Sequence, residues 1–378
     1  MALQIAIDCR SLRKKPAGVP NFLISFIHEA VNQHPDWSFY LLSNEAFGDE
    51  VKSRLIIHPS VHIVISPLPV IPRIAIAWYL VKLPFLVKRL KADLFFTPVP
   101  NLPLFLFGKV KKLIVVHDMV YKLFPSTMSA GNWWINFFLH NYSFQKADHI
   151  WSVSAYTKKE IEVFFPKRKS KKVFVGSSVD KSIFFKSSVS DEKKGVLLTK
   201  LNLAPKFLLF VGTLEPRKNL SFLLSLLPDL AAHGFELLIV GAKGWGKMEL
   251  SEFQKLSEFQ KNKVKFSGFI SNEELVVLYN IACVYVSTSL NEGFGLPQLE
   301  AMSCGCPVVT AHNSAMIEIA EGAGETVVGW EKEEWISTII KVSENREYYS
   351  QKGVERAKVY DWSVIVKNLS TYLDEPTH

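Results

Sequence analysis

The chain has 378 residues, of which 48% are hydrophobic and 21% are charged. This composition excludes a disordered or fibrous protein, and the length predicts two or three globular domains with their own cores. The formal net charge of +8 is uneven, because residues 1–180 carry 23 Lys/Arg against 12 Asp/Glu and the remainder carries 21 against 24. A basic first half favours an anionic partner, such as a membrane surface or a lipid-phosphate acceptor; no nucleic-acid-binding signature is present, and no nucleic acid is expected.

The chain start and the cysteines predict a cellular compartment. The first ten residues, MALQIAIDCR, read as a strand and not as a signal peptide, since they lack a basic region followed by an apolar core. The cysteines are Cys9, Cys283, Cys304 and Cys306, and none has metal-ligand spacing with a histidine. We therefore expect inert, reduced thiols and a cytoplasmic protein, at most peripheral at the inner face of a membrane.

The first half predicts a domain of alternating strands and helices over residues 1–180. Residues 3–8 read as the first strand, and a loop with the lone glycine Gly18 separates it from a helix over 22–31. Further strands are expected at residues 37–43, 61–66, 112–116, 150–153 and 173–175. His117 directly follows one of these strands, and ligands bind at such strand ends in open α/β sheets.

Two apolar stretches of this half leave membrane contact open. Residues 68–106 are apolar but interrupted by prolines, so no run reaches the ~20 residues that a spanning helix needs. Residues 74–90 fit a basic amphipathic helix pair at a membrane surface and, about equally, a core helix kinked at Pro84. The aromatic stretch 132–140 has the same two interpretations.

The second half predicts a more regular domain over residues 201–358, after an irregular polar connection at 181–200. Short apolar runs read as buried strands at residues 207–211, 235–240, 264–267, 284–287, 308–310 and 326–328. Helical segments separate most of them, which indicates a parallel, doubly wound sheet. A last helix with apolar spacing is expected within residues 359–378.

One stretch, residues 291–310 with the sequence NEGFGLPQLEAMSCGCPVVT, combines several signals of an anion site. It follows the expected strand at 284–287, and Gly293 and Gly295 allow a tight turn before a helix whose start suits Pro297. Backbone amides and the positive end of the helix dipole then converge at the carboxyl edge of a sheet. The stretch therefore predicts that an anion binds there.

Charged side chains accompany this predicted anion site. Glu292 and Glu300 flank the glycines, and carboxylates accept hydrogen bonds from hydroxyl groups. Arg217 and Lys218 lie in the turn GTLEPRKN after the strand at 207–211. Two cations at the start of a helix oppose its dipole unless an anion lies between them and the amides. A phosphate held between hydroxyl-bearing groups describes a nucleotide sugar.

The Glu-x7-Glu pattern with GFGLP inside it resembles the retaining glycosyltransferases of family 4. The resemblance implies the GT-B fold, an α/β architecture of two Rossmann-like, doubly wound parallel-sheet domains facing a central cleft, with the C-terminal helix joined to the first domain. It is strong over residues 207–321 and weak over 1–180. It implies transfer of a hexose from a nucleotide-diphosphate sugar to a glycan or lipid-linked acceptor. The GTLEPRKN form is similar to that of mannosyl- and rhamnosyltransferases of bacterial surface polysaccharide synthesis.

The resemblance also implies roles for individual residues. Glu292 binds hydroxyls of the transferred sugar, and His117 contacts this sugar from the other domain. The donor-binding residues are Arg217, Lys218, Thr213, Gly293, Phe294, Gly295, Leu296, Gly18 and, for the ribose, Glu300. The sequence contains no Asp-x-Asp pair, so neither a metal nor a further cofactor is expected. Two alternatives remain, namely a GT-B epimerase or phosphorylase and a non-catalytic nucleotide-sugar-binding protein.

Overall fold

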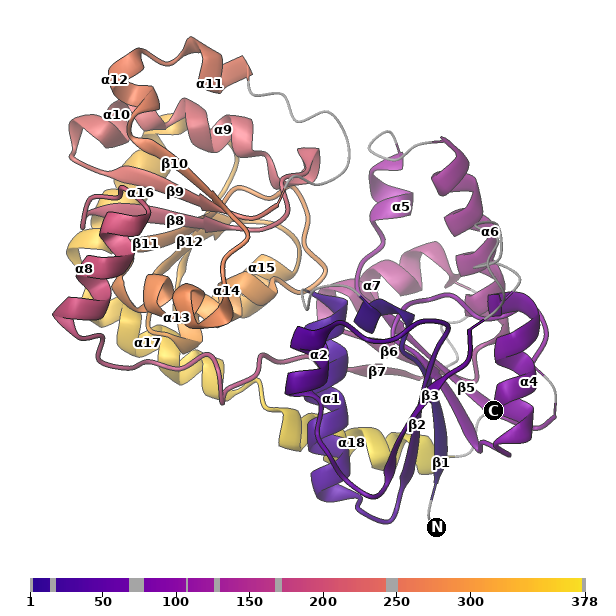
Figure 1. The fold of residues 1–378 in the computed structure, drawn as a ribbon. Helices are drawn as coiled ribbons and strands as arrows, with labels where there is room; N and C mark the ends of the chain where they lie inside the picture. The colour runs from indigo at the N-terminus through magenta and orange to yellow at the C-terminus, as the bar shows by residue number, and fades with distance from the viewer. Residues whose placement is uncertain are drawn as a thin grey trace. The chain divides into compact units, whose positions relative to one another are not determined.

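The computed structural model describes residues 3–13, 18–67, 78–106, 108–125, 130–166, 172–242 and 251–375. The chain divides into two compact units (Figure 1). Unit 1 comprises Met1–Leu123, Ser129–Ser178 and Asp361–His378, and unit 2 comprises Phe124–Met128 and Val179–Tyr360.

Unit 1 is built on a parallel sheet of seven strands in the order β3-β2-β1-β4-β5-β6-β7. Its strands are β1 (Gln4–Asp8), β2 (Ser38–Ser43), β3 (Val61–Ile65), β4 (Leu94–Thr97), β5 (Lys111–Val116), β6 (His149–Ser152) and β7 (Val173–Val175). The order reverses between β1 and β4, which makes the sheet doubly wound, as the sequence predicts. Strand β4 was not predicted, because its LFFT run lies inside residues 68–106, an apolar stretch interrupted by prolines and charges.

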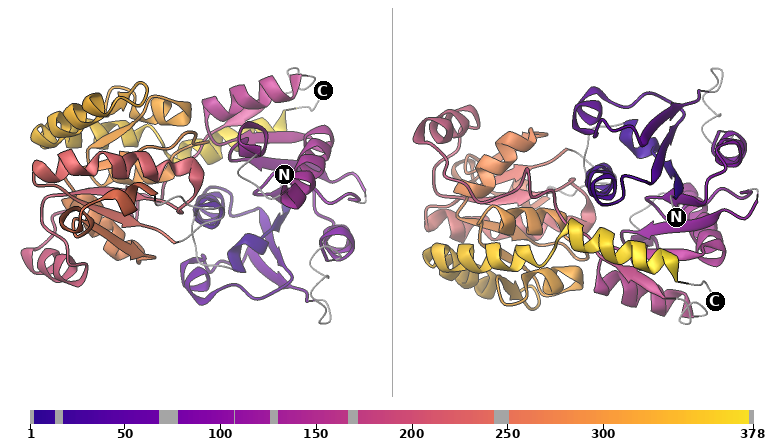
Figure 2. Two further views of the ribbon diagram at one scale, coloured as in Figure 1. Left: turned by 90° about the horizontal axis from the view of Figure 1, so that it is seen from above. Right: turned by 90° about the horizontal axis from the view of Figure 1, so that it is seen from below.

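The helices of unit 1 pack around this sheet, and the last helix of the chain is one of them. They are η1 (Arg10–Arg13), α1 (Val19–Gln33), α2 (Asp49–Arg54), η2 (Trp78–Lys82), α4 (Leu83–Arg89), α5 (Val120–Leu123), α6 (Ala130–Lys146), α7 (Ala155–Phe164) and α18 (Trp362–Asp374). Asp361 caps α18 by accepting a hydrogen bond from the amide of Ser363 at 2.7 Å. The Trp362 ring lies 5.2 Å from the Phe22 ring of α1, so α18 packs on unit 1 (Figure 2, yellow).

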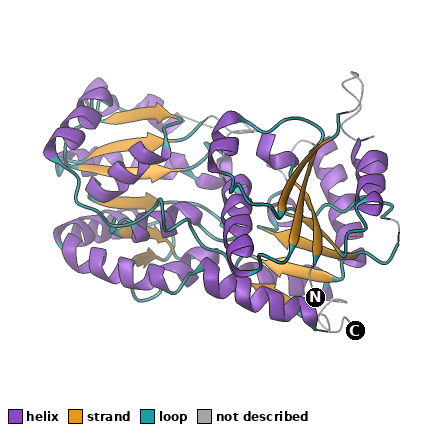
Figure 3. Cartoon of the chain, turned by 60° about the horizontal axis from the view of Figure 1, so that its bottom comes forward, coloured by secondary structure: helices purple, strands orange, loops and turns teal. Residues whose placement is uncertain are grey.

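Unit 2 repeats the architecture with six parallel strands in the order β10-β9-β8-β11-β12-β13. Its strands are β8 (Phe207–Val211), β9 (Glu236–Val240), β10 (Val264–Gly268), β11 (Val284–Ser287), β12 (Val308–Ala311) and β13 (Glu325–Val327). Its helical segments are α8 (Asp191–Lys200), η5 (Pro216–Lys218), α9 (Leu220–Ser225), α10 (Leu227–Ala232), α11 (Ser251–Lys255), α12 (Glu258–Lys261), α13 (Asn272–Ile281), α14 (Leu296–Ser303), α15 (Ser314–Ala320), α16 (Lys332–Glu344) and α17 (Arg346–Lys358). Figure 3 shows helices flanking the strands of each unit.

One sequence interpretation of this region is wrong. Residues 181–200 are irregular only in their first half, because α8 occupies the second half. Ser190 caps this helix by accepting a hydrogen bond from the amide of Lys193, and Asp191 and Glu192 favour its first turn.

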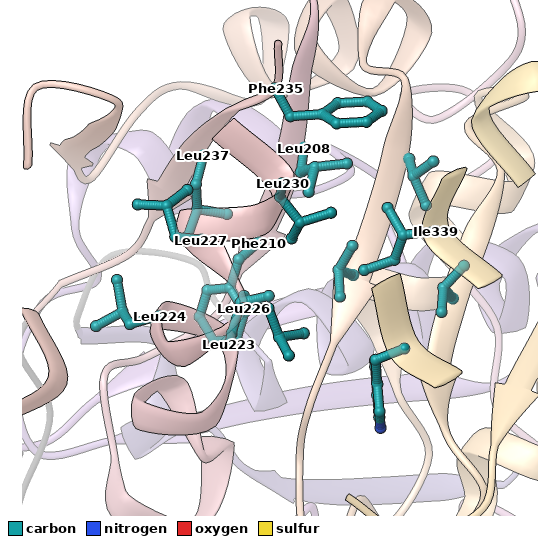
Figure 4. Close-up of a cluster of buried hydrophobic side chains, with 14 of the residues drawn as sticks. Leu208, Phe210, Leu223, Leu224, Leu226, Leu227, Leu230, Phe235, Leu237 and Ile339 are labelled. Carbon is teal, nitrogen blue, oxygen red and sulfur yellow. The ribbon is translucent and has the colours of Figure 1, made fainter. Parts of the chain in front are cut away.

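The core of unit 2 explains the rigidity of its strand ends. Leucines of α9 and α10 pack on β8 and β9, and Ile339 of α16 belongs to the same cluster (Figure 4). Leu208, Phe210 and Leu237 are at most 1% exposed. Burial of each such side chain contributes about 1.5–3 kcal/mol, which holds the strands in register and their loops in place.

In the described part of the chain, no helix combines the length and the apolar character that crossing a membrane requires.

Candidate functional site

The predicted site residues of unit 2 gather at the carboxyl edge of its sheet, where the strand order reverses between β8 and β11. Ligands of open α/β sheets bind at such a switch point. The two loops that follow these strands are joined: the amide of Leu290 donates to the carbonyl oxygen of Arg217 at 2.8 Å, and the Thr288 hydroxyl donates to that of Lys218 at 3.1 Å. Asn219 has a left-handed backbone (φ 50°), a conformation that asparagine tolerates better than most residues, and it turns the chain from η5 into α9.

Glu292 binds both predicted cations. Its Oε2 accepts from Arg217 Nη1 at 3.0 Å, its Oε1 accepts from Lys218 Nζ at 2.5 Å, and the Ser289 hydroxyl donates to Oε1 at 2.6 Å. Arg217 also donates to the carbonyl oxygen of Asn291. The side chains of the three charged residues are only 11–12% exposed. The loops after β8 and β11 therefore present one carboxylate held between two cations.

The ionisation of Glu292 follows from these contacts. Burial alone would raise its pKa, but the charges of Lys218 and Arg217, with hydrogen bonds from Lys218 and Ser289, outweigh burial and lower the pKa to about 2. Glu292 is thus an anion at neutral pH, and the cluster of Arg217, Lys218 and Glu292 carries one net positive charge.

Several residues that the sequence did not single out position this cluster. The Ser314 hydroxyl accepts from the amide of Glu292 at 3.0 Å, and Asn313 Nδ2 donates to the carbonyl oxygen of Ser289 at 3.1 Å. Glu215 lies 3.7 Å from Arg217. The polar run Ser287–Ser289, which begins at the last residue of β11, is a sequence signal for Ser289 alone.

The glycine loop enters α14 as the sequence predicts. Gly295 has φ 92° and precedes the first helical residue, Leu296, while Gly293 and Phe294 are buried in the loop before it. The amides of Gln298 and Leu299 already donate to the carbonyl oxygen of Gly295, and Pro297 has no amide hydrogen, so an anion at this helix start would be bound by amides that precede Pro297. Gly305, with φ 72°, ends the helix in a Schellman motif, because its amide and that of the next residue donate to carbonyl oxygens of the last turn.

Glu300 lies within the unit and not at its surface, being 8% exposed. Its Oε2 accepts from the hydroxyl of Tyr279 at 3.0 Å. Burial, with the charges of Glu292 and Glu300, raises the pKa of Tyr285 on β11. Tyr279 is therefore a buried partner of Glu300 that the sequence pattern did not indicate.

Thr213 is exposed in the loop after β8, next to two backbones in close approach. A Cβ on Gly241 would lie 2.0 Å from the carbonyl oxygen of Gly212, so only glycine fits there. The loop that begins at Gly241 resembles a base- or ribose-binding loop of the family 4 glycosyltransferases, but its residues 243–246 lie outside the described residues.

The two predicted residues of unit 1 lie near the carboxyl edge of its sheet. Gly18 is exposed at the start of α1 with φ 53°. His117 follows β5, and its Nε2 lies 2.8 Å from the carbonyl oxygen of Pro98. Since a carbonyl only accepts, Nε2 carries the proton. Burial lowers the pKa of His117 against smaller opposite effects of Pro98 and Asp118, so the ring is neutral and its Nδ1 is an acceptor.

Comparison with known proteins identifies the domain that carries the cluster. Residues 191–358 match the family model described as Glycosyl transferases group 1. This part of unit 2 is thus similar to a group 1 glycosyl transferase domain. The chain is similar to O-antigen chain mannosyltransferase B from Escherichia coli, with 32% identity over 162 residues, which are 41% of this chain and 42% of the relative. The chain thus spans less than half the length of that relative.

Solved structures confirm the fold that the sequence predicts. The chain resembles sucrose-phosphate synthase from Thermosynechococcus elongatus with a TM-score of 0.75 and 18% identity, over 99% of this chain and 98% of that one. It also resembles Anabaena HepE, solved in complex with UDP and glucose, with a TM-score of 0.69 and 19% identity over the whole of both chains. These are GT-B proteins, and the two Rossmann-like parallel-sheet domains of this chain are a GT-B fold. The first half, which the family model does not match, shares the fold through these structures.

Proposed function

We propose that the protein is a retaining hexosyltransferase that moves mannose or rhamnose from a nucleotide-diphosphate sugar to a glycan or glycolipid acceptor in bacterial surface polysaccharide synthesis. The observation that carries the proposal is the pairing of Glu292 with Arg217 and Lys218 at the switch point of unit 2. A diphosphate needs the two cations, and a sugar ring next to it needs the carboxylate. The similarity to an O-antigen mannosyltransferase favours GDP-mannose as donor.

The chemistry proposed for this cluster is stabilisation of the leaving group. When the bond between the sugar and the phosphate breaks, negative charge grows on the diphosphate and the anomeric carbon becomes cation-like. Arg217, Lys218 and the amides of residues 293–296 bind this charge without a metal. The acceptor hydroxyl attacks from the face that the diphosphate leaves and transfers its proton to the leaving phosphate, so the configuration is retained.

The remaining predicted residues position the donor in this proposal. Glu292 accepts hydrogen bonds from sugar hydroxyls, and Glu300 accepts one from the ribose beside its bond to Tyr279. His117 offers its neutral Nδ1 to a sugar hydroxyl. Gly18 and Thr213 bring backbone amides near the donor.

A thermal-shift screen against UDP-, GDP- and dTDP-sugars identifies the donor class, and transfer of a labelled sugar from the best donor tests the reaction. We expect Glu292→Gln to lower the transfer rate at least 100-fold. Glu236→Gln is a matched control, because Glu236 is also buried and paired with a lysine, Lys263 at 3.1 Å, but it begins β9 at the opposite edge of the same sheet. Parental transfer by Glu292→Gln would refute the proposed site, and release of an isomerised donor would favour an epimerase.

We also propose that unit 1 contacts an anionic membrane surface at the inner face of the membrane. Trp134, Ile135 and Phe138 on α6 are 52%, 53% and 62% exposed, and aromatic side chains of this kind suit a membrane interface. In the other apolar stretch, residues 74–90, Val81 and Phe85 are exposed. Residues 74–77 of this stretch lie outside the described residues. The protein should float with anionic vesicles at low salt, and Trp134→Ser with Phe138→Ser should release it. A parent that stays in the soluble fraction would contradict this proposal.

A further inference from the structure

Unit 1 contains a pocket that lies apart from the residues discussed so far. It has a volume of about 510 Å³, within the range of about 300–1,000 Å³ typical of small-molecule sites. Its walls come from the residues just before β1, β4 and β5, from the C-terminal end of α4 and from the C-terminal end of α18.

The position of this pocket separates it from the transferase site. It opens at the amino edge of the sheet, where β5 begins at Lys111, whereas His117 follows the other end of that strand. At a rise of ~3.3 Å per residue, the strand places the two edges roughly 20 Å apart. A ligand of this pocket therefore does not reach His117 or Gly18.

The charges in the pocket favour an anion. Four lysines line it, namely Lys88, Lys91, Lys109 and Lys111, against the two carboxylates of Asp93 and Asp374. Asp93 is engaged by the backbone, because it accepts from the amide of Gln4 at 2.9 Å. Among the described residues, the ammonium groups of Lys91 and Lys109 have neither a hydrogen-bond nor an ion-pair partner. The surplus of two positive charges balances the negative charge of a phosphate monoester, which is about −2 near neutral pH.

The backbone supports a role for Lys91. Its φ of 51° is left-handed, at the position after α4 where glycine is preferred. The amide of Lys91 donates to the carbonyl oxygen of Lys88 at 3.1 Å, and that of Ala92 donates to Val87 at 3.4 Å, which closes the helix end with a lysine in the strained position. This turn holds the side chain of Lys91 at the pocket.

The rest of the lining is aliphatic. Val87, Leu94, Val110 and Leu373 are buried and form an apolar wall. Lys111 Nζ donates to the carbonyl oxygen of Leu373 at 3.4 Å, which ties the end of α18 to the sheet. A bare inorganic anion would leave this wall unused, whereas the carbon skeleton of an organic phosphate would cover it.

From this arrangement we infer that unit 1 has a second binding site, for a small organic phosphate such as a hexose phosphate. The phosphate lies among Lys91, Lys109 and Lys111, and the carbon skeleton lies on the aliphatic wall. The ligand joins α18 to the strands β4 and β5, so its binding stabilises the attachment of α18 to unit 1. This site does not depend on the proposed transferase function.

Calorimetric titration of the full chain with a hexose 6-phosphate, the unphosphorylated hexose and inorganic phosphate tests the inference. We expect saturable binding of the ester, at least tenfold weaker binding of inorganic phosphate and none of the hexose. Lys91→Gln with Lys109→Gln should weaken the ester at least tenfold, since hydrogen bonds to charged groups are among the strong ones. A control variant, Lys146→Gln with Lys159→Gln, removes two charges from exposed positions outside the pocket and should change the affinity for the ester less than twofold. Arg217→Gln, which alters the proposed donor site, should also change this affinity less than twofold.

A further variant separates binding from folding. Lys91→Gly relieves the strain of the left-handed backbone, so it should raise the melting temperature, whereas the loss of the lysine side chain should weaken binding of the ester. The inference would be overturned if the parent did not bind the ester, or if Lys91→Gln with Lys109→Gln bound it as the parent does. Loss of binding in Arg217→Gln would also overturn it, because the ester would then occupy the donor site. Binding of phosphatidic acid vesicles in place of the soluble ester would also overturn it.

Discussion

The paired state of Glu292 predicts that neutralising this residue tightens the binding of a nucleoside diphosphate that carries no sugar. In the structure the carboxylate occupies both cations, at 3.0 Å from Arg217 and 2.5 Å from Lys218. An arriving diphosphate must share these cations with Glu292 and is repelled by it. Glu292→Gln removes the repulsion and keeps the shape of the side chain.

The size of the effect follows from the charges. At ~6 Å and an effective dielectric constant of about 20, two unit charges repel each other by about 3 kcal/mol. If screening by water removes half of this, about 1.5 kcal/mol remains, which corresponds to roughly tenfold tighter binding. For a complete nucleotide-sugar donor, Glu292→Gln should raise the affinity less, because the sugar hydroxyls lose the carboxylate as hydrogen-bond acceptor.

Isothermal titration of GDP and UDP into the parent and the variant measures this difference. Glu236→Gln serves again as control and should leave both affinities unchanged. Equal or weaker binding by Glu292→Gln would refute the reasoning, since it would show that the carboxylate does not compete with the diphosphate for Arg217 and Lys218.

Three further predictions concern pH, packing and the histidine. The lowered pKa of Glu292 contributes stability above about pH 4.5 that is lost as the pH falls toward about 2, so Glu292→Gln should flatten the acid unfolding curve across this range, as circular dichroism can follow. Gly305→Ala should destabilise the protein by about 2 kcal/mol in urea unfolding, because a Cβ there adopts φ 72° and lies 2.7 Å from the hydroxyl oxygen of Ser350, whereas Gly195→Ala in α8 meets no atom within 4 Å and should stabilise it slightly. His117→Phe should lower sugar transfer at least tenfold without changing nucleoside diphosphate affinity, and the parental rate should show no step from this ring near pH 6.5, because burial keeps it neutral.

Local patterns in the sequence predict most of the fold. Twelve of the thirteen strands that the structure describes coincide within one residue with short apolar runs that β-branched residues and glycines make recognisable, and the GT-B resemblance supplies their arrangement. Strand β4 escapes because LFFT is one of several short apolar runs between the prolines of residues 68–106. Helix α8 escapes because DEKKGVLLTK is polar and contains a glycine, although Ser190 followed by two acidic residues is a helix-start signal.

For the candidate site as well, the sequence predicts the local features and not the contacts between distant residues. The sequence indicates Glu292, Arg217 and Lys218 because glycine loops and charge patterns are local. It does not indicate that one carboxylate pairs with both cations, since this contact joins residues 74 or 75 positions apart and depends on β8 lying beside β11. The buried partners Tyr279 and Ser314 escape for the same reason.

Transfer of a radiolabelled hexose by the parent and by Arg217→Gln, with the melting temperature of each recorded, tests directly whether the cations at the end of β8 serve the reaction. We expect transfer by the parent and a loss of at least 100-fold in the variant, with the fold retained. Transfer by Arg217→Gln at the parental rate would contradict the claim that the cations at the end of β8 bind the donor diphosphate.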